Sequence, residues 1–290
     1  MGPEFGTGGF LAHINLDDEK VIRVEKLPSN AQVPYSLADY KAVYRIMIND
    51  ANCIAALKKR GITEEDVKEE KVDIDPYPGG GINPHPSIPN GHRSIKTLLL
   101  YKVRPHDNIY ARPIQNLIVH VNLTNGIVAA LEDHGAIPLR PHVQNDHYDK
   151  EMLPLERSTL RPLDVVQRKG PSFSTVGHNI KWENWDFRIS MHAIHGLVLH
   201  QISFHSRPIL FRASFTEMVV PYGDSSPMHC WKHVLDASEY HMGNKANSLE
   251  LGCDCLGTIK YFDTCHISNA VSYTHLRAHE TLRYLVCRLL

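Results

Sequence analysis

Residues 209–262 read ILFRASFTEMVVPYGDSSPMHCWKHVLDASEYHMGNKANSLELGCDCLGTIKYF, and they set the architecture expected for the chain. Apolar and polar residues alternate at the start, which predicts a β-strand over 209–220 with one buried face. That face consists of Ile209, Phe211, Ala213, Phe215 and Val219. The turn-forming residues 221–224 end the strand, and a segment that carries Asp236 follows.

Further strands are expected around this stretch. From residue 170 onward, short alternating segments separated by turn residues follow one another without a helical pattern. They lie at 174–177, 180–190, 196–205, 209–220 and 257–262. Such a series is typical of a large all-β sandwich.

A helix and an antiparallel sheet are expected nearer the N-terminus. Ser36 and Asp39 form a capping-box pattern, apolar residues recur after them at helical spacing, and Gly61 ends the helix. Thr63 begins a short acidic helical turn. Strands are expected at 95–103, 117–122 and 126–132, the last two joined by a hairpin. The sequence therefore predicts a small α+β domain over residues 36–139.

The composition excludes several classes of function. The chain has 290 residues, a net charge of −1 and 42% hydrophobic residues, which gives no reason to expect nucleic acid or a membrane surface as a partner. No apolar run approaches the roughly 20 residues that span a bilayer, and no secretory signal is visible. Six cysteines in a chain of this length do not form a disulfide scaffold.

Several motifs follow one another along the chain. They are LKKRGIT at 57–63, YARPI at 110–114, GPSF at 170–173, WENW at 182–185, GLVLHQISF at 196–204, MVVPYGD at 218–224, ANSLELGCDCLG at 246–257 and IKYFD at 259–263. In order and spacing they resemble the copper- and topaquinone-dependent primary amine oxidases, over roughly residues 20–268.

The resemblance implies how the chain is divided. Residues 36–139 would be the small α+β domain, 140–165 a linker, and 166–270 the incomplete start of the catalytic β-sandwich domain. Residues 1–35 would be the remnant of a preceding small α+β domain, behind a start typical of a cloning junction. Residues 271–290 leave the pattern of the family, and we expect them to be a non-native tail.

The resemblance also implies an activity. Members of the family are homodimers that use copper and topaquinone to oxidise primary amines with oxygen, and they yield aldehyde, ammonia and hydrogen peroxide. We therefore expect a primary amine and oxygen as substrates and a homodimer in the intact protein. The cytoplasm and the peroxisome are the favoured locations.

Five positions take roles from the resemblance. Asp236 occupies the position of the catalytic base, and Val234 that of a gate over the quinone, which is often aromatic in the family. Tyr240 matches an aromatic residue of the substrate channel, and Pro113 and Ile114 match a further part of that channel. Because valine is small, we expect a wider entrance that admits a bulkier amine.

Two further residues, Cys255 and Ser238, have expectations of their own, and Asp236 has an alternative role. Cys255 occupies the position of a cysteine that forms a disulfide, with no partner identified in this chain. Ser238 stands where the family has glycine, so it would be strained if that position needs a positive φ. On spacing alone, Asp236 could instead cap a helical turn.

The cofactor residues of the family are not found in this sequence. It contains no Asn-Tyr pair of the kind that becomes topaquinone and no His-x-His pair of the kind that binds copper. We therefore expect the chain alone to be catalytically inert. We also expect poor solubility, because half a sandwich leaves an apolar face uncovered.

Two other functions stay open. A non-catalytic β-rich scaffold or binding module would have the same architecture without quinone or copper. A metal-binding module would use the histidines that lie close together in sequence, although their spacing matches no known metal site and such residues are usually part of a pleated surface. These are His192, His195, His200 and His205.

Overall fold

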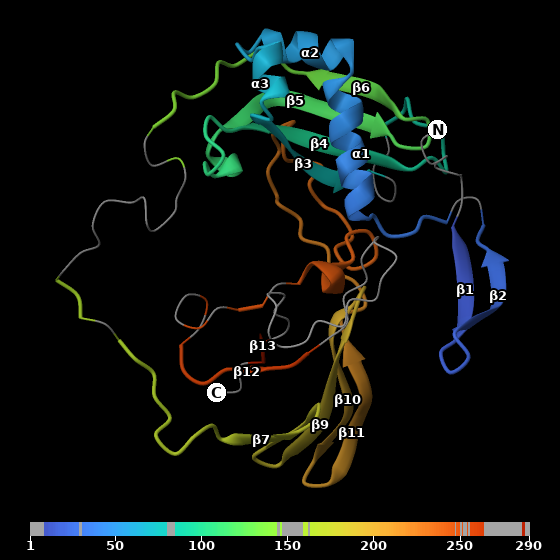
Figure 1. Ribbon diagram of the computed structural model, residues 1–290, viewed down its shortest axis with the longest axis vertical. Helices are drawn as coiled ribbons and strands as arrows, with labels where there is room; N and C mark the ends of the chain where they lie inside the picture. Colours follow the sequence, from blue (N-terminus) through green and yellow to red (C-terminus); the bar gives the residue numbers. More distant parts are fainter. Residues whose placement is uncertain are drawn as a thin grey trace. The chain divides into compact units, whose positions relative to one another are not determined.

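The computed structural model consists of two compact units (Figure 1). Unit 1 comprises Met1–Glu156 with Val219–Val234, and unit 2 comprises Arg157–Met218 with Leu235–Leu290. The described residues are 9–28, 31–79, 85–143, 146, 159–161, 163–246, 248–249, 251, 254, 256–263 and 286–287. Antiparallel sheets dominate both units, which confirms the predicted class of a small α+β domain followed by the start of a β-sandwich. None of the helices in the described part of the chain is long and apolar enough to span a membrane.

The helical region of unit 1 is divided into α1 (Leu37–Ile48), α2 (Ala51–Lys58) and α3 (Glu64–Lys68). The capping box at Ser36 is confirmed: its N–H donates to the Asp39 carboxylate at 2.7 Å, and its Oγ accepts from the Asp39 N–H at 3.3 Å. The predicted single helix ending at Gly61 is wrong. Asp50 has an extended backbone and accepts two N–H groups of α2 at 2.9 Å, so it separates the first helix from the second.

Unit 1 is built on a four-stranded antiparallel sheet in the order β3–β4–β5–β6. Its strands are β3 (Val72–Pro78), β4 (Ser94–Tyr101), β5 (Pro113–Asn122) and β6 (Ile127–Asp133), with the 3-10 turn η1 (Ile109–Ala111) before β5. Helix α1 lies across one face (Figure 1), where Val43, Met47 and Leu99 are fully buried. The sequence does not predict β3 because Pro76 and Pro78 interrupt it, but an edge strand tolerates proline.

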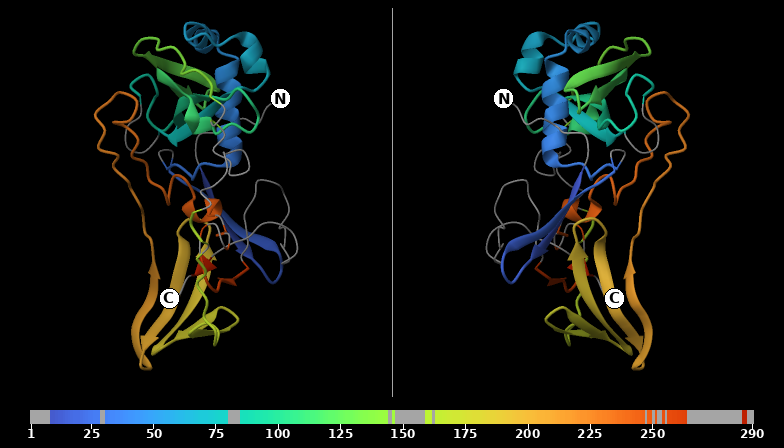
Figure 2. Two further views of the ribbon diagram at one scale, coloured as in Figure 1. Left: turned by 90° about the vertical axis from the view of Figure 1, so that its left-hand side faces the viewer. Right: turned by 90° about the vertical axis from the view of Figure 1, so that its right-hand side faces the viewer.

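Residues 219–234 of the same unit cover the opposite face of this sheet (Figure 2). The ring of Trp231 meets that of Tyr77 edge to face, with centroids 5.3 Å apart, and Lys96 Nζ lies 5.1 Å from the Trp231 ring. Lys232 is buried, with Nζ 5.2 Å from the Tyr77 ring. These contacts show that the stretch after the predicted strand packs on the small α+β unit.

Unit 2 contains a five-stranded meander in the order β7–β8–β9–β10–β11. The strands are β7 (Phe173–Val176), β8 (Asn179–Trp182), β9 (Trp185–His192), β10 (Gly196–Phe204) and β11 (Arg207–Ser214), and β12 (Lys260–Tyr261) pairs with β13 (Val286–Cys287). The predicted strand 180–190 is wrong as one element, because a turn at Glu183, with φ 53°, divides it. The core of the unit contains Ile180, Phe187, Ile189, Ile202 and Phe262.

Strand β11 differs from its prediction in length and burial. It ends at Ser214 instead of residue 220, and Phe211 on the face expected to be buried is 83% exposed. As the last strand of the meander, β11 has a neighbour on one side only, and the core of the unit forms over β8 to β10. The alternating pattern therefore identifies an apolar face of β11 that is suited to packing against another element. No element of the described part of this chain covers it.

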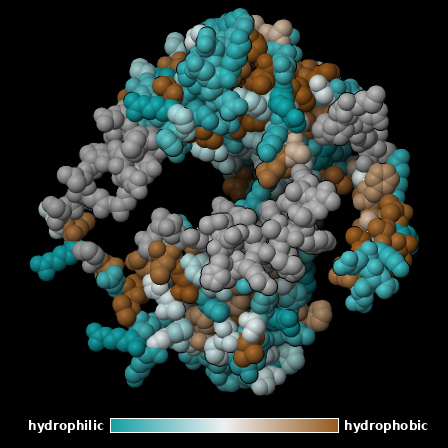
Figure 3. Space-filling view, in the orientation of Figure 1, coloured by the Kyte–Doolittle hydropathy of each residue, from teal (hydrophilic) through white to brown (hydrophobic). Residues whose placement is uncertain are grey.

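A separate hairpin near the N-terminus consists of β1 (Phe10–Asn15) and β2 (Lys20–Lys26). The alternating residues 21–24 predict part of β2, whereas the sequence does not predict β1. Large apolar side chains of this hairpin lie on the surface (Figure 3), among them Phe10, Ile14 and Ile22. A two-stranded ribbon is too thin to bury them by itself.

Candidate active site

The candidate active site is the loop of unit 2 that carries Asp236. The Asp236 N–H donates to the Met218 carbonyl at 2.9 Å, so this turn is attached to the chain that leaves β11. The next residue, Ala237, is fully buried. The N–H of Leu235 is satisfied by the Glu239 carboxylate at 2.8 Å. Asp236 itself caps no backbone N–H among the described residues, so the structure gives no support to the capping alternative.

Glu217 is the main anchor of this loop. Its carboxylate accepts the N–H groups of Met218 at 3.0 Å, Ala237 at 2.8 Å and Ser238 at 3.1 Å. Three N–H donors on one carboxylate stabilise its charged form and hold the two chain segments together. Sequence reasoning missed Glu217, and its only signal was its place immediately before the MVVPYGD motif.

The far end of the loop lies on the turn between β9 and β10. The 3-10 turn η3 (Met242–Lys245) brings Gly243 so close that a Cβ there would lie 1.9 Å from the His192 carbonyl oxygen. The Asn244 N–H donates to the Ala193 carbonyl at 2.8 Å. Only glycine fits at position 243, and this contact fixes the loop at a second point.

Charge and burial around Asp236 act on its basicity. The residue is half-buried, and its pKa is raised by desolvation and by the negative charge of Glu217, while Lys245 opposes the rise. Desolvation lowers the pKa of Lys245 to about 8, although much of this residue remains exposed. Nζ of Lys245 lies 4.1 Å from the centre of the Tyr240 ring. The loop thus brings a carboxylate, an amine and an aromatic ring into one neighbourhood.

Loss of the amine should raise the pKa of Asp236 further. In Lys245→Met the positive charge that favours the carboxylate form is gone, so the Asp236 carboxyl should titrate at a higher pH than in the parent chain. Carboxyl ¹³C NMR of the 290-residue chain measures this. Lys169→Met, at an exposed position of the same unit, is the matched control and should leave the titration unchanged. An unchanged or lower Asp236 midpoint in Lys245→Met would contradict the arrangement.

The other predicted site residues lie in different surroundings. Val234 is 9% exposed and belongs to unit 1, as do Pro113, which is exposed, and Ile114, which is fully buried in the core. Tyr240 is half-buried and follows Asp236 by four residues in the same loop. The roles of these residues in a gate or channel stay predictions.

Two expectations about neighbouring positions have different outcomes. Ser238 does not adopt a positive φ, so the strain considered for it is absent, and its N–H donates to Glu217 at 3.1 Å. Cys255 lies outside the described residues, and the described Cys53 and Cys230 are free thiols.

The histidines of β9 and β10 form separate contacts. His192 and His195 stack with ring centroids 4.6 Å apart, whereas His200 Nε2 is paired with Ser190 Oγ at 2.7 Å. His205 contacts the ring of Phe204. Among the described residues, these histidines do not bring three ligand atoms together, so they give a metal-binding module no support.

Comparison with known proteins defines the class. Residues 38–151 match the family model described as copper amine oxidase, N3 domain, and residues 174–279 match copper amine oxidase, enzyme domain. The chain therefore contains a region similar to the N3 domain of such enzymes, followed by a region similar to part of their enzyme domain. It belongs to the copper amine oxidase family.

The relatives show how much of such a protein is present. The chain is 39% identical to a primary amine oxidase of Arthrobacter sp. (strain P1) over 258 residues, covering 88% of this chain and 38% of the relative. It is 35% identical to a peroxisomal copper-containing diamine oxidase of Nicotiana tabacum, covering 86% and 32%. The crystal structure of a copper-containing benzylamine oxidase from Hansenula polymorpha matches with a TM-score of 0.70 at 25% identity, covering 91% and 42%. The chain thus spans about two fifths of the length of the first of these relatives.

Proposed function

We propose that this chain carries the proton-abstracting part of a primary amine oxidase, with Asp236 as the base. The observation that supports this is the state of Asp236: it is half-buried, its pKa is raised, and its loop is held by Glu217 and Gly243. It also lies inside the region that matches the enzyme domain of the family.

The chemistry of the base follows from its surroundings. Removing a proton from the carbon next to the amine nitrogen needs a carboxylate that is ionised yet poorly hydrated. Desolvation and the charge of Glu217 make Asp236 a stronger base than an exposed aspartate, and the positive charge of Lys245 favours its ionised form. The ring of Tyr240, which lies beside the Lys245 side chain, supplies an apolar surface for the substrate.

In the intact enzyme the cofactors would be copper and topaquinone, which accept the electrons and pass them to oxygen, with aldehyde, ammonia and hydrogen peroxide as products. The residues of this chain do not fit these groups, because the sequence has neither a His-x-His nor an Asn-Tyr pair. The group of three metal-ligating side chains found among the described residues lies in unit 1, in the region that matches the N3 domain. The cofactor residues would have to come from sequence that these 290 residues do not include.

Further parts of the proposal concern the substrate and the assembly. Val234 and Pro113 would line the approach to the base, with the buried Ile114 supporting Pro113 from the core, and the small Val234 would favour a bulky amine. The intact protein would be a homodimer in the cytoplasm or the peroxisome, and a tobacco relative carries the word peroxisomal in its name. Residues 36–139 and 166–270 would form separate domains joined by the linker 140–165.

Peroxide release from benzylamine and methylamine tests the proposal. We expect none above a protein-free blank from the 290-residue chain, and release from the product of the complete reading frame that contains it. Benzylamine should be turned over faster than methylamine, and the reverse order would contradict the role given to Val234.

The complete reading frame also separates the two candidate functions. An Asn-Tyr-Asp/Glu motif and a His-x-His pair beyond codon 268 would support the enzyme. If the complete product lacks both motifs and releases no peroxide, the proposal fails in favour of a non-catalytic β-rich scaffold or binding module.

A further inference from the structure

One group of side chains in unit 1 is not used by the proposed reaction. His120 on β5 and Glu132 on β6 project from the sheet face opposite α1, and His85 reaches them from the loop between β3 and β4. The ligand atoms of the three residues all lie within 4.8 Å of one another. From this convergence we infer a binding site for a divalent transition-metal ion, for which Zn²⁺ is the appropriate probe.

The donor set suits such an ion. Two imidazole nitrogens and one carboxylate oxygen are ligands typical of Zn²⁺ and of its neighbours in the first transition row, and they leave further positions for water. His120 Nε2 and Glu132 Oε1 are 2.6 Å apart, and the rings of His85 and His120 have centroids 4.5 Å apart. Because Zn²⁺ takes its ligands at about 2.0–2.2 Å, the hydrogen-bonded His120 and Glu132 would have to separate slightly to admit the ion, and His85 would have to rotate toward them.

The sheet fixes two of the three ligands. His120 is 5% exposed and pairs across the strands with Lys96 on one side and Ala130 on the other, which holds its position. Glu132 lies two residues along β6 from Ala130, on the same face. The loop residue His85 is the ligand that can adjust.

A third histidine, His134, contacts the other oxygen of the Glu132 carboxylate. His134 Nε2 lies 3.4 Å from the second oxygen of Glu132, so one carboxylate is shared between a buried and a partly exposed imidazole. Outer partners of this kind hold a ligating carboxylate and raise its affinity for the ion. An isolated ion pair between His120 and Glu132 would need neither His85 nor His134.

Two features oppose binding and set its strength. The ammonium of Lys96, on the strand next to His120, repels a cation. The Ser87 N–H donates to Nδ1 of His85 at 3.2 Å. This hydrogen bond has to break or shift when the imidazole of His85 turns to bind a metal ion. We therefore expect a site of moderate affinity.

Zinc binding to the complete 290-residue chain tests the inference. Isothermal titration with Zn²⁺ should give one site, and Co²⁺ as a spectroscopic probe should show visible absorption bands of imidazole and carboxylate ligation. Glu132→Gln and His85→Gln should weaken Zn²⁺ binding by more than about 100-fold, and His134→Gln by about 10-fold, as expected for an outer partner.

His106→Gln is the matched control, because His106 is an exposed histidine of the same unit. It should bind Zn²⁺ like the parent chain. His85 and His134 are partly exposed, so their substitution should not prevent folding. The test therefore needs no variant of the buried His120. The inference is overturned if the parent chain does not bind Zn²⁺, or if Glu132→Gln and His85→Gln bind it as tightly as His106→Gln does.

Discussion

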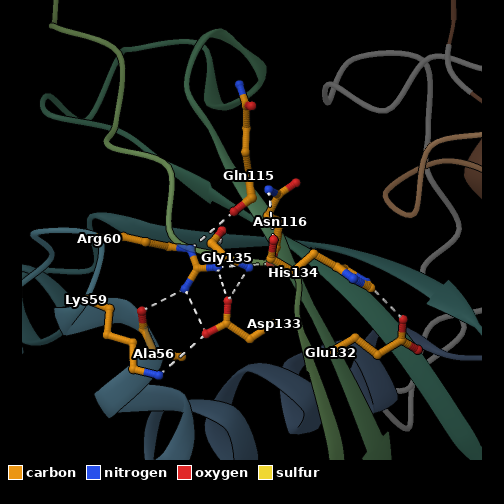
Figure 4. Close-up of polar contacts among 9 residues, drawn as sticks. All are labelled: Ala56, Lys59, Arg60, Gln115, Asn116, Glu132, Asp133, His134 and Gly135. Atoms are coloured by element: carbon orange, nitrogen blue, oxygen red, sulfur yellow. Dashed lines mark hydrogen bonds and ion pairs between the residues drawn. The ribbon is translucent and has the colours of Figure 1, made fainter.

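Replacing Arg60 with methionine should lower the free energy of unfolding of unit 1 by about 2–3 kcal/mol, because the acceptors of a fully buried guanidinium would lose their donor. The Arg60 side chain is fully buried, and its guanidinium lies 2.6 Å from the Asp133 carboxylate (Figure 4). Methionine has a similar length and no charge, so the change removes the hydrogen bonds with little loss of volume.

The expected loss of stability follows from the number of acceptors to which Arg60 donates hydrogen bonds. Its guanidinium donates to the carbonyl oxygens of Ala56 at 3.0 Å, Gln115 at 3.1 Å and Asn116 at 2.9 Å. Strand β5 bulges at residues 115–117, with Asn116 at φ 58°, so two of these carbonyls are turned away from the neighbouring strand. Without Arg60, the buried Ala56 carbonyl, the partly buried carbonyls of the bulge and the carboxylate of Asp133 lose their donor together.

Lys59→Met is the matched control. Lys59 approaches the same Asp133 carboxylate at 3.7 Å, but its side chain is 66% exposed, so its loss should cost no more than about 1 kcal/mol. Urea unfolding of the 290-residue chain measures both variants, and hydrogen exchange of peptides from α2 and β6 locates the effect. Equal stability of the two variants would show that the Arg60 network contributes little.

Asp236→Asn should lower kcat/KM for benzylamine by about 10²–10⁴-fold, the range that a positioned general base contributes. The measurement uses the enzyme encoded by the complete reading frame, since it rests on the proposed function. Asparagine keeps the shape of the side chain and cannot accept the proton. Asp164→Asn, at an exposed position of the same unit, should retain full activity. Comparable activity of the two variants would remove Asp236 from the proposed role.

The pH dependence of kcat/KM provides a second test of the role of Asp236. A base must be ionised, so kcat/KM should rise with pH through the pKa of Asp236, which lies above the ordinary value of 3.8. Glu217→Gln removes a nearby negative charge and lowers the pKa of Asp236, so the acidic limb should move to lower pH. A limb that stays in place in Glu217→Gln would show that Glu217 acts only through the backbone of the loop.

Local features of the fold follow from neighbouring residues and could be predicted. Ser36 and Asp39 cap α1 as their spacing indicates, because both partners lie within one helical turn. The break at Asp50 could not be predicted from apolar spacing, since the residues on both sides continue the same periodic pattern. The order of motifs identified the family because a long series of them rarely arises by chance.

The sequence by itself determined the class of each unit, the family, and Asp236 as the candidate base. Tertiary structure alone decided which face of β11 is exposed, which residue anchors the loop, and where ligating side chains meet. The reason is distance along the chain: Arg60 and Asp133 are 73 residues apart, and Glu217 reaches Ala237 across 20. Such contacts depend on how strands pair and pack, and no local spacing encodes them.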